Sequence, residues 1–263
     1  MLQIENITKT FFPGTVNERV ALNNVSLQLN TGDFVTVIGS NGAGKSTLLN
    51  MISGKLPFDS GDLSIDGKSV KRMPDYARAA FVGRVFQDPM AGTAPDLSIE
   101  QNLALALRRG QHRGLSWGVT HKRRAFFREE LISLELGLED RLKARVGLLS
   151  GGQRQALSLL MASFTQPRIL LLDEHTAALD PQRAELVTTL TETIVAKHNL
   201  TTLMVTHNME QALRLGNRLV MMHEGQIIFD IGAESKATMT VPDLLAEFSK
   251  IKGASLDDRA LLG

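Results

Sequence analysis

Short runs of apolar residues recur along this chain and predict β-strands. An alternation at Val25, Leu27 and Leu29 is followed by the run FVTVI at 34–38. Further runs of the same kind are LSI at 63–65, FVGRVF at 81–86, ILLL at 169–172, TTLMV at 201–205 and LVMMHEGQIIF at 219–229. Because short apolar strands that alternate with helical patterns form parallel sheets with crossover connections, we expect an α/β fold with a mostly parallel sheet. The paired runs near the N-terminus predict an antiparallel β patch beside it.

One long stretch, residues 88–165, interrupts this alternation and predicts helices instead. Ser98 and Gln101 have the spacing of a capping box at the start of a helix. A second helical pattern covers 124–136 and ends before Gly137, a residue type that commonly follows a helix. We therefore expect an α-helical subdomain inserted into the α/β core.

The whole chain, 1–263, is expected to form one domain. With 43% apolar residues in 263, the chain can bury a large core without a disulfide or a metal. The expected parts are a core of 1–87 and 166–229, the helical subdomain of 88–165, and a tail of 230–263 that contains one helix near 242–249.

Composition excludes several classes of protein. The chain has no cysteine, which excludes disulfides, thiolate catalysis and cysteine-bound metals, and is compatible with a reducing cytosol. Its formal net charge of +1 gives no overall field that would favour nucleic acid. The N-terminal residues carry Glu5 and Lys9 among apolar positions, unlike a secretory signal, and no apolar run approaches the 18 or so residues that span a bilayer. We expect a protein that acts, if at a membrane, from outside the lipid.

A glycine-rich segment directly after the run FVTVI has the pattern of a phosphate-binding loop. Such a loop curls so that several backbone N–H groups point at one phosphate, and the following helix N-terminus adds partial positive charge. In this pattern the lysine reaches the β- and γ-phosphates of a nucleotide and the serine hydroxyl binds Mg²⁺. The residues predicted to bind ATP in this way are Gly39, Ser40, Asn41, Gly42, Ala43, Gly44, Lys45, Ser46 and Thr47.

Two more segments carry related chemistry. The run ILLLDE ends in Asp173, a candidate Mg²⁺ ligand, and Glu174, a candidate base for the attacking water. Taken alone, a carboxylate pair at a strand end is more often an ordinary solvated turn, and the phosphate loop in the same chain favours the functional interpretation. Further upstream, LSGGQ places Ser150, Gly151 and Gly152 at the start of an apolar helix, where bare N–H groups form a second anion site or a serine simply caps the helix.

The LSGGQ sequence, about a hundred residues after a phosphate loop, resembles the ATP-binding cassette of ABC transporters, over residues 2–229. In that family two cassettes pair head to tail, which implies a homodimer with ATP and Mg²⁺ as cofactors. Each ATP then lies between the phosphate loop of one copy and the signature residues Ser150, Gly151, Gly152 and Gln153 of the other. The resemblance covers most of the chain, and its motifs are specific as a set.

The resemblance also implies roles for single residues. Gln87 would sense Mg²⁺ and water, so that the metal set becomes Ser46, Gln87 and Asp173. Asp180 would cross the dimer interface, although Asp180 before Pro181 also reads as a helix N-cap. His207 would contact the γ-phosphate, with a surface histidine as the alternative.

Further roles follow from the same family pattern. Phe11 would stack on adenine, with Phe12 adjacent, and Glu174 with Gln87 and His207 would form the catalytic set. His175 and Ala177 stand where many cassettes have proline and serine, which leaves Asp173, Glu174 and Asp180 intact.

The expected partners follow from the family as well. The chain resembles bacterial importer cassettes, which implies an integral membrane permease, a substrate-binding protein, a place at the cytoplasmic face of the membrane and no nucleic acid. DEHTAALDP with SLLMASF is similar to a subgroup for which amino acids, tryptophan among them, are a proposed cargo. The alternatives are a soluble ABC-type ATPase that acts on nucleic acid or ribosomes, disfavoured by a single phosphate loop and no heptads, and a small nucleotide kinase, which leaves LSGGQ unexplained.

The segment 108–128 concentrates basic residues that the net charge conceals. It contains seven Lys or Arg, no acidic residue and Trp117, the single tryptophan of the chain. The two interpretations are a solvated loop and a surface beside the permease and the anionic inner leaflet.

Overall fold

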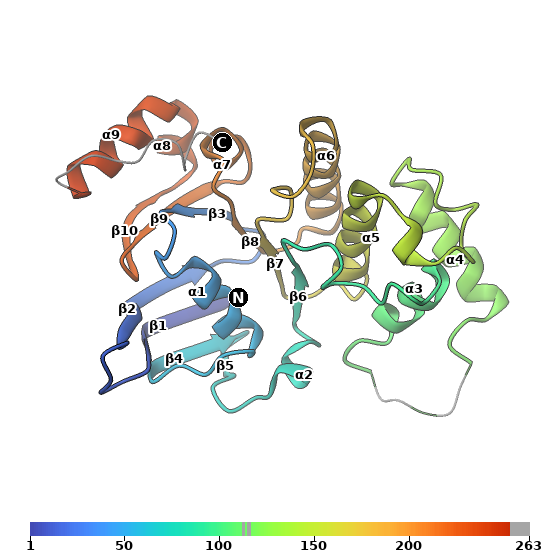
Figure 1. The fold of residues 1–263 in the computed structure, drawn as a ribbon, viewed down its shortest axis with the longest axis horizontal. Helices are drawn as coiled ribbons and strands as arrows, with labels where there is room; N and C mark the ends of the chain where they lie inside the picture. The colour runs from blue at the N-terminus through green and yellow to red at the C-terminus, as the bar shows by residue number, and fades with distance from the viewer. Residues whose placement is uncertain (112–113, 115–116, 253–263) are drawn as a thin grey trace. The chain divides into compact units, whose positions relative to one another are not determined.

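The computed structural model describes residues 1–111, 114 and 117–252, and these form two compact units (Figure 1). The first unit consists of Met1–Asp75 and the chain from Leu200 onward, and the second is Tyr76–Asn199. The helices expected at 88–165 lie in the second unit, together with two strands and a long helix. The exact limits of an inserted subdomain remain a prediction.

The first unit contains an antiparallel sheet in the order β2-β1-β4-β5. Leu2 of β1 pairs with Leu29 of β2, and on the other side with Ile65 of β4. Leu2 and Ile4 of β1 face a core, and a register shift after Ile4 turns Ile7 to the same core; all three are fully or almost fully buried. This sheet confirms the antiparallel patch. Its strands are β1 (Leu2–Phe11), β2 (Arg19–Leu29), β4 (Ser60–Ile65) and β5 (Lys68–Ser69).

A second group of strands in the first unit runs in the order β10-β9-β3-β8. Strand β3 pairs in parallel with both β8 and β9, while β10 is antiparallel to β9. All six residues of β3 are buried, as expected for a strand between two parallel neighbours, and the hydroxyl of its polar residue, Thr36, donates to the Ala212 carbonyl at 2.9 Å. The strands are β3 (Phe34–Gly39), β8 (Thr202–Val205), β9 (Arg218–His223) and β10 (Gln226–Ile231).

The C-terminal tail contains two helices, whereas the sequence predicted one. The expected helix is α9, whose Leu244 and Phe248 are buried in a cluster with Met209 and Met221. The additional helix α8 is short and polar, so it shows no apolar periodicity; Lys236 holds it in place by donating to the carbonyls of Leu215 and Gly216. The helices of this unit are α1 (Lys45–Ser53), α7 (Met209–Arg214), α8 (Ala233–Thr238) and α9 (Val241–Lys252).

The second unit combines one parallel strand pair with helices. Strands β6 (Val82–Val85) and β7 (Ile169–Asp173) pair in register from Val82 with Ile169 to Val85 with Leu172. Its helices are α3 (Ile99–Leu107), α4 (His121–Ile132), α5 (Gly151–Ser163), α6 (Pro181–His198) and the 3₁₀ turn Val146–Leu148, and α2 (Asp75–Arg78) spans the boundary between the units.

Local capping explains where the helices of the second unit begin. The predicted capping box of Ser98 and Gln101 is present at α3. Helix α4 starts at His121, three residues before the expected start, because the Thr120 side chain accepts a hydrogen bond from the Arg123 N–H. None of the described helices has both the length and the apolar character needed to cross a membrane.

Candidate functional site

The segment between β3 and α1 has the backbone of an anion-binding loop. Three of its glycines have positive φ, 151° at Gly39, 81° at Gly42 and 98° at Gly44. A Cβ on Gly39 would lie 2.1 Å from the Met222 carbonyl oxygen, so only glycine fits there. Helix α1 begins at Lys45, directly after Gly44, and no side chain caps its N-terminus. The loop therefore leaves the first N–H groups of a nine-residue helix to an outside acceptor.

Lys45 brings its charge into this loop. Its side chain is almost buried, and Nζ donates to the carbonyls of Gly39 at 2.6 Å and Ser40 at 3.1 Å. Ser46, by contrast, is exposed at the first turn of α1, where its hydroxyl is open to a ligand. A curled backbone, an uncapped helix start and a buried ammonium together fit a phosphate chain.

Contacts from the rest of the first unit fix the loop. The Gly225 N–H, in the turn between β9 and β10, donates to the Ala43 carbonyl at 3.1 Å, and its own carbonyl accepts from Asn23 at 2.8 Å. Arg19 of β2 donates to the Gly42 carbonyl at 2.9 Å. These bonds satisfy carbonyl groups at the back of the loop and hold its shape before a ligand arrives.

His207 follows strand β8 and lies at the same edge of the sheet as the phosphate loop, which follows β3. Strands β3 and β8 are parallel neighbours, and the Thr206 N–H extends their ladder by donating to Val37 at 3.1 Å. The Thr206 hydroxyl donates to the side chain of Gln211 in α7, which fixes the backbone just before the half-buried His207. The carboxyl ends of parallel strands are where α/β proteins bind ligands.

Phe11 is the last residue of β1 and is partly buried, with the Lys9 ammonium 5.8 Å from its ring centre. Phe12 is 66% exposed, in the loop that joins β1 to β2. Both rings belong to the first unit. Their stacking on adenine remains a prediction.

Asp173 is the last residue of strand β7 in the second unit, and Glu174 follows it directly. The Asp173 carboxylate accepts a hydrogen bond from Arg84 of β6 at 2.7 Å, and both side chains are largely buried, at 14% and 9% exposure. Glu174 has a φ of 44°, a left-handed conformation that is uncommon outside glycine. The Ala177 N–H donates to the Glu174 carbonyl, which closes the turn. Backbone strain of this kind is frequent at functional sites.

The Arg84 contact is one that sequence reasoning missed. Its signal was a single charged residue inside the otherwise apolar run FVGRVF. Gln155 was missed as well; it is fully buried in α5 and donates to the Phe86 carbonyl at 3.0 Å. That contact anchors the chain immediately before Gln87, which is exposed after β6.

Two backbone N–H groups of the signature residues, 150–153, already have hydrogen-bond acceptors within the segment. The Ser150 hydroxyl accepts from the Gln153 N–H, and the Gln153 side chain accepts from the Ser150 N–H. The serine cap, one of the two interpretations of the sequence, is therefore present, and the Ser150 N–H is not bare because it donates to the Gln153 side chain. The contact of this segment with ATP of a second copy remains a prediction. Gly151 and Gly152 occupy the first two positions of α5, ahead of the capped donor, and Gly152 lies against Arg183, where a Cβ would be tight.

Asp180 is the N-cap of α6, as one of its two predicted roles required. Its side chain accepts from the Arg183 N–H at 3.1 Å, and Pro181 takes the first helical position. Half of the Asp180 side chain remains exposed. Its contact across a dimer interface remains a prediction.

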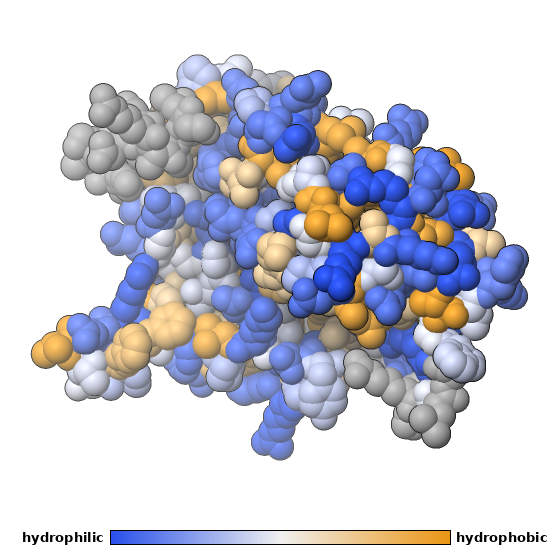
Figure 2. All heavy atoms as spheres, turned by 45° about the vertical axis from the view of Figure 1, so that its right-hand side comes forward, coloured by the Kyte–Doolittle hydropathy of each residue, from blue (hydrophilic) through white to orange (hydrophobic). Residues whose placement is uncertain are grey.

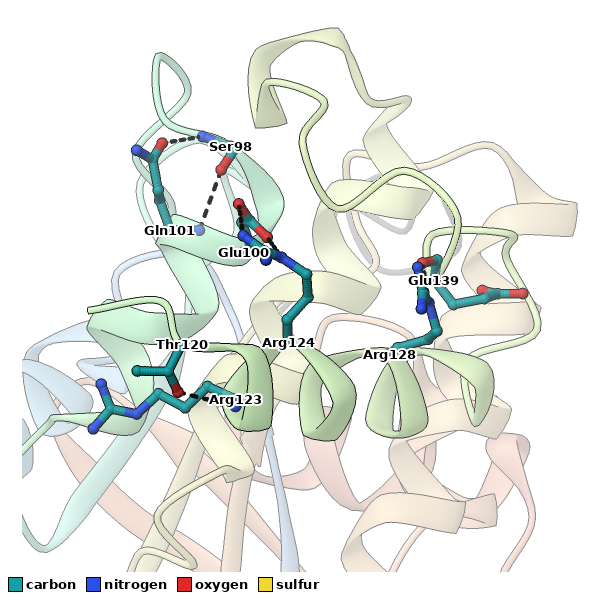
Figure 3. A network of polar contacts seen from close by, with 8 residues as sticks. All are labelled: Ser98, Glu100, Gln101, Thr120, Arg123, Arg124, Arg128 and Glu139. Atoms are coloured by element: carbon teal, nitrogen blue, oxygen red, sulfur yellow. Dashed lines mark hydrogen bonds and ion pairs between the residues drawn. The ribbon is translucent and has the colours of Figure 1, made fainter. Parts of the chain in front are cut away.

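The basic segment proves to be partly anchored (Figure 3). Arg124 makes two hydrogen bonds to Glu100 of α3, at 2.6 and 3.1 Å. Arg123 donates to the carbonyls of Trp117 and Gly118. Lys122, in contrast, is exposed, and so is Trp117 at 86%. The segment is therefore not a uniformly solvated run, and its residues 112–113 and 115–116 lie outside the described residues.

Apolar side chains on the surface do not form one continuous area on the face that Figure 2 presents, where hydrophilic side chains separate them. Exposed apolar residues of the second unit include Leu105, Trp117 and Leu148. Dispersed apolar residues of this kind are ordinary on protein surfaces.

The donor set fits Mg²⁺ that arrives with phosphates. Among the described residues, no three His, Asp or Glu side chains gather into a metal site. Mg²⁺ normally uses one or two protein oxygens together with phosphate oxygens and water. A serine hydroxyl, one carboxylate and one amide, as in Ser46, Asp173 and Gln87, are donors of that kind. Ser46 belongs to the first unit and the other two to the second, so their meeting at one ion remains a prediction.

This fold and loop define a P-loop nucleotide-binding protein. The model of the ABC transporter family matches residues 22–177, so the chain belongs to that family. It is 45% identical to a tyrosine transport ATP-binding protein of Clostridioides difficile, over 94% of this chain and 98% of that protein. It is also 33% identical to the xylose/arabinose import ATP-binding protein XylG of Sulfolobus acidocaldarius, over 95% of each.

Solved structures agree with this assignment. The ATP-binding cassette MJ0796, in a dimeric post-hydrolysis state bound to ADP and Pi, matches with a TM-score of 0.76 at 30% identity, over 89% of this chain and 99% of that one. The ADP conformation of the cassette MJ1267 matches with a TM-score of 0.76 at 27% identity, over 94% and 98%. The chain is an ATP-binding protein of an ABC transporter and an ATPase of this class.

Proposed function

We propose that this chain energises the uptake of amino acids through a separate membrane permease. The observation that carries the proposal is the 45% identity, over nearly the full length of both chains, to a tyrosine transport ATP-binding protein. A sugar importer cassette is less similar, at 33%. Because a cassette does not touch the cargo, this likeness supports the cargo through shared partners rather than through residues of this chain.

The proposed chemistry assigns the phosphates of ATP to residues 39–47. Backbone N–H groups and Lys45 hold the β- and γ-phosphates, and Phe11 stacks on adenine. Mg²⁺, when bound through Ser46, Asp173 and Gln87, neutralises charge that develops on the phosphates.

We assign the activation of the attacking water and the contact with the γ-phosphate to Glu174, His207 and Gln87. Glu174 orients the attacking water and accepts its proton, and His207 donates a hydrogen bond to the γ-phosphate. Gln87, at the start of the helical region, contacts the metal and the attacking water. In each case the proposal rests on the position of the residue in a motif and on its place at a strand end.

The proposed assembly is a head-to-tail homodimer bound to the cytoplasmic face of the membrane. Ser150, Gly151, Gly152, Gln153 and Asp180 contact ATP held by the other copy. The dimeric state of the MJ0796 cassette supports this arrangement. The remaining partners are the permease and a substrate-binding protein.

Reconstitution tests this function directly. The chain is purified from its native membranes in mild detergent together with the permease that accompanies it, and the complex is placed in proteoliposomes with ATP on the cassette side. We expect ATP-driven uptake of labelled tyrosine or another aromatic amino acid, and we expect Glu174→Gln to abolish it. ATP hydrolysis without uptake of any amino acid, or hydrolysis that RNA stimulates, would contradict the proposal.

A further inference from the structure

The pairing of β6 with β7 places the Arg84 side chain near the carboxyl end of β7. Arg84 pairs with Leu171 in the parallel register. Side chains two residues apart on a strand share a face, so Leu171 and Asp173 point the same way. The long arginine side chain therefore reaches along this face to the carboxylate one pleat further on, and donates to Oδ2 at 2.7 Å.

This arginine is held firmly in place. Its guanidinium carbon lies 4.8 Å from the centre of the Phe86 ring, a cation–π distance. Phe86 is itself fixed through its carbonyl by the buried Gln155. With Arg84 and Asp173 both largely buried, water screens their charges only weakly.

The contact leaves the two oxygens of Asp173 unequal. Oδ2 accepts from Arg84, while in the part of the chain that the structure describes Oδ1 has no protein donor. A full positive charge beside a carboxylate reduces its attraction for a divalent cation, and a hydrogen bond to one oxygen orients the other.

We propose that Arg84 is a positioning residue that sets the magnesium dependence of nucleotide binding by sharing the Asp173 carboxylate. This inference rests on the proposed role of Asp173 as the carboxylate of the magnesium site. Arg84 presents Oδ1 to the metal and keeps the affinity for Mg²⁺ below the value that an unpaired carboxylate would give, so that the metal leaves readily with the product.

The test separates charge from hydrogen bonding. Arg84→Gln retains a side-chain donor but loses the charge, whereas Arg84→Lys retains the charge. For each variant, the affinity for a fluorescent ADP analogue is measured by anisotropy in excess Mg²⁺ and in EDTA. The ratio of the two affinities reports the coupling between metal and nucleotide without any turnover.

We expect this ratio to rise by roughly tenfold in Arg84→Gln and to stay near the wild-type value in Arg84→Lys. A purely structural arginine would lower the melting temperature of both variants and leave the ratio unchanged, and that result would overturn the inference. Should Arg84→Gln fail to fold, Phe86→Leu loosens the same guanidinium, and the ratio should rise in that variant too.

Asp173→Asn distinguishes the inference from the function on which it rests. If Asp173 belongs to the magnesium site, Asp173→Asn removes most of the gain in affinity that Mg²⁺ provides. A normal ratio in Asp173→Asn would refute the metal role of Asp173 and with it the inference. A lowered ratio there, combined with an unchanged ratio in Arg84→Gln, would refute the role of Arg84 alone.

Discussion

Acid should destabilise this protein through one buried histidine, His175, next to the proposed catalytic base. The Thr191 hydroxyl gives its own hydrogen to the Val187 carbonyl, so it can only accept from His175 Nε2, at 3.0 Å. Among the described residues, Nδ1 has no hydrogen-bond partner. Burial lowers the pKa of His175 from 6.5 to about 4, because the charged imidazolium loses its hydration.

The sign and size of the effect follow from this shift. Between the two pKa values, 6.5 − 4 = 2.5 units apart, the unfolded chain binds a proton that the folded chain does not. Stability is therefore fully present above the unfolded pKa and decreases as the pH falls toward 4. The full shift corresponds to about 3 kcal/mol, of which about 2 kcal/mol is lost by about pH 5.

Urea unfolding followed by circular dichroism, at a series of values from about pH 7.5 to about pH 5, measures this loss. His175→Gln keeps a donor for Thr191 but cannot titrate, so it provides the matched control. We expect the wild-type free energy of unfolding to fall by about 2 kcal/mol more than that of the variant. Parallel losses in the two proteins would show that the imidazole is not buried in its neutral form.

Three further predictions follow from the loop and the helices. Lys45→Ala should weaken ATP binding at least tenfold by equilibrium dialysis, whereas Ser150→Arg should bind ATP normally and lose hydrolysis; equal loss of binding would contradict the head-to-tail assignment. Gly39→Ala should lower the free energy of unfolding by more than about 2 kcal/mol in a urea titration, and a neutral result would show that the loop relaxes. Arg124→Gln should lower the melting temperature by a few degrees, whereas Lys122→Gln should leave it unchanged. If Lys122→Gln reduces retention of the protein on anionic vesicles, the segment 108–128 contacts lipid rather than only water.

The sequence was sufficient to predict features that depend on neighbours along the chain. The phosphate loop follows from glycine spacing after a strand, and the helix starts at Ser98 and Asp180 follow from local side-chain caps. These contacts join residues three apart, so the pattern contains both partners. The mixture of parallel and antiparallel strands also followed, because a mainly apolar strand such as β3 needs partners on both sides.

Contacts between distant segments could not be predicted in this way. Arg84 and Asp173 are 89 residues apart, and only the parallel register of β6 and β7 brings them together. The environment of His175 likewise depends on Thr191 in helix α6. Helix α8 was not predicted because hydrogen bonds from Lys236, rather than an apolar stripe, hold it in place.

The most direct test of the account is the oligomeric state of the Glu174→Gln variant with and without ATP, measured by light scattering. The variant keeps the shape of the side chain but loses the carboxylate, so ATP should bind and remain intact. We expect a monomer without nucleotide and a dimer in saturating ATP. A monomer at saturating ATP, or hydrolysis at the wild-type rate, would contradict both the dimer and the role of Glu174.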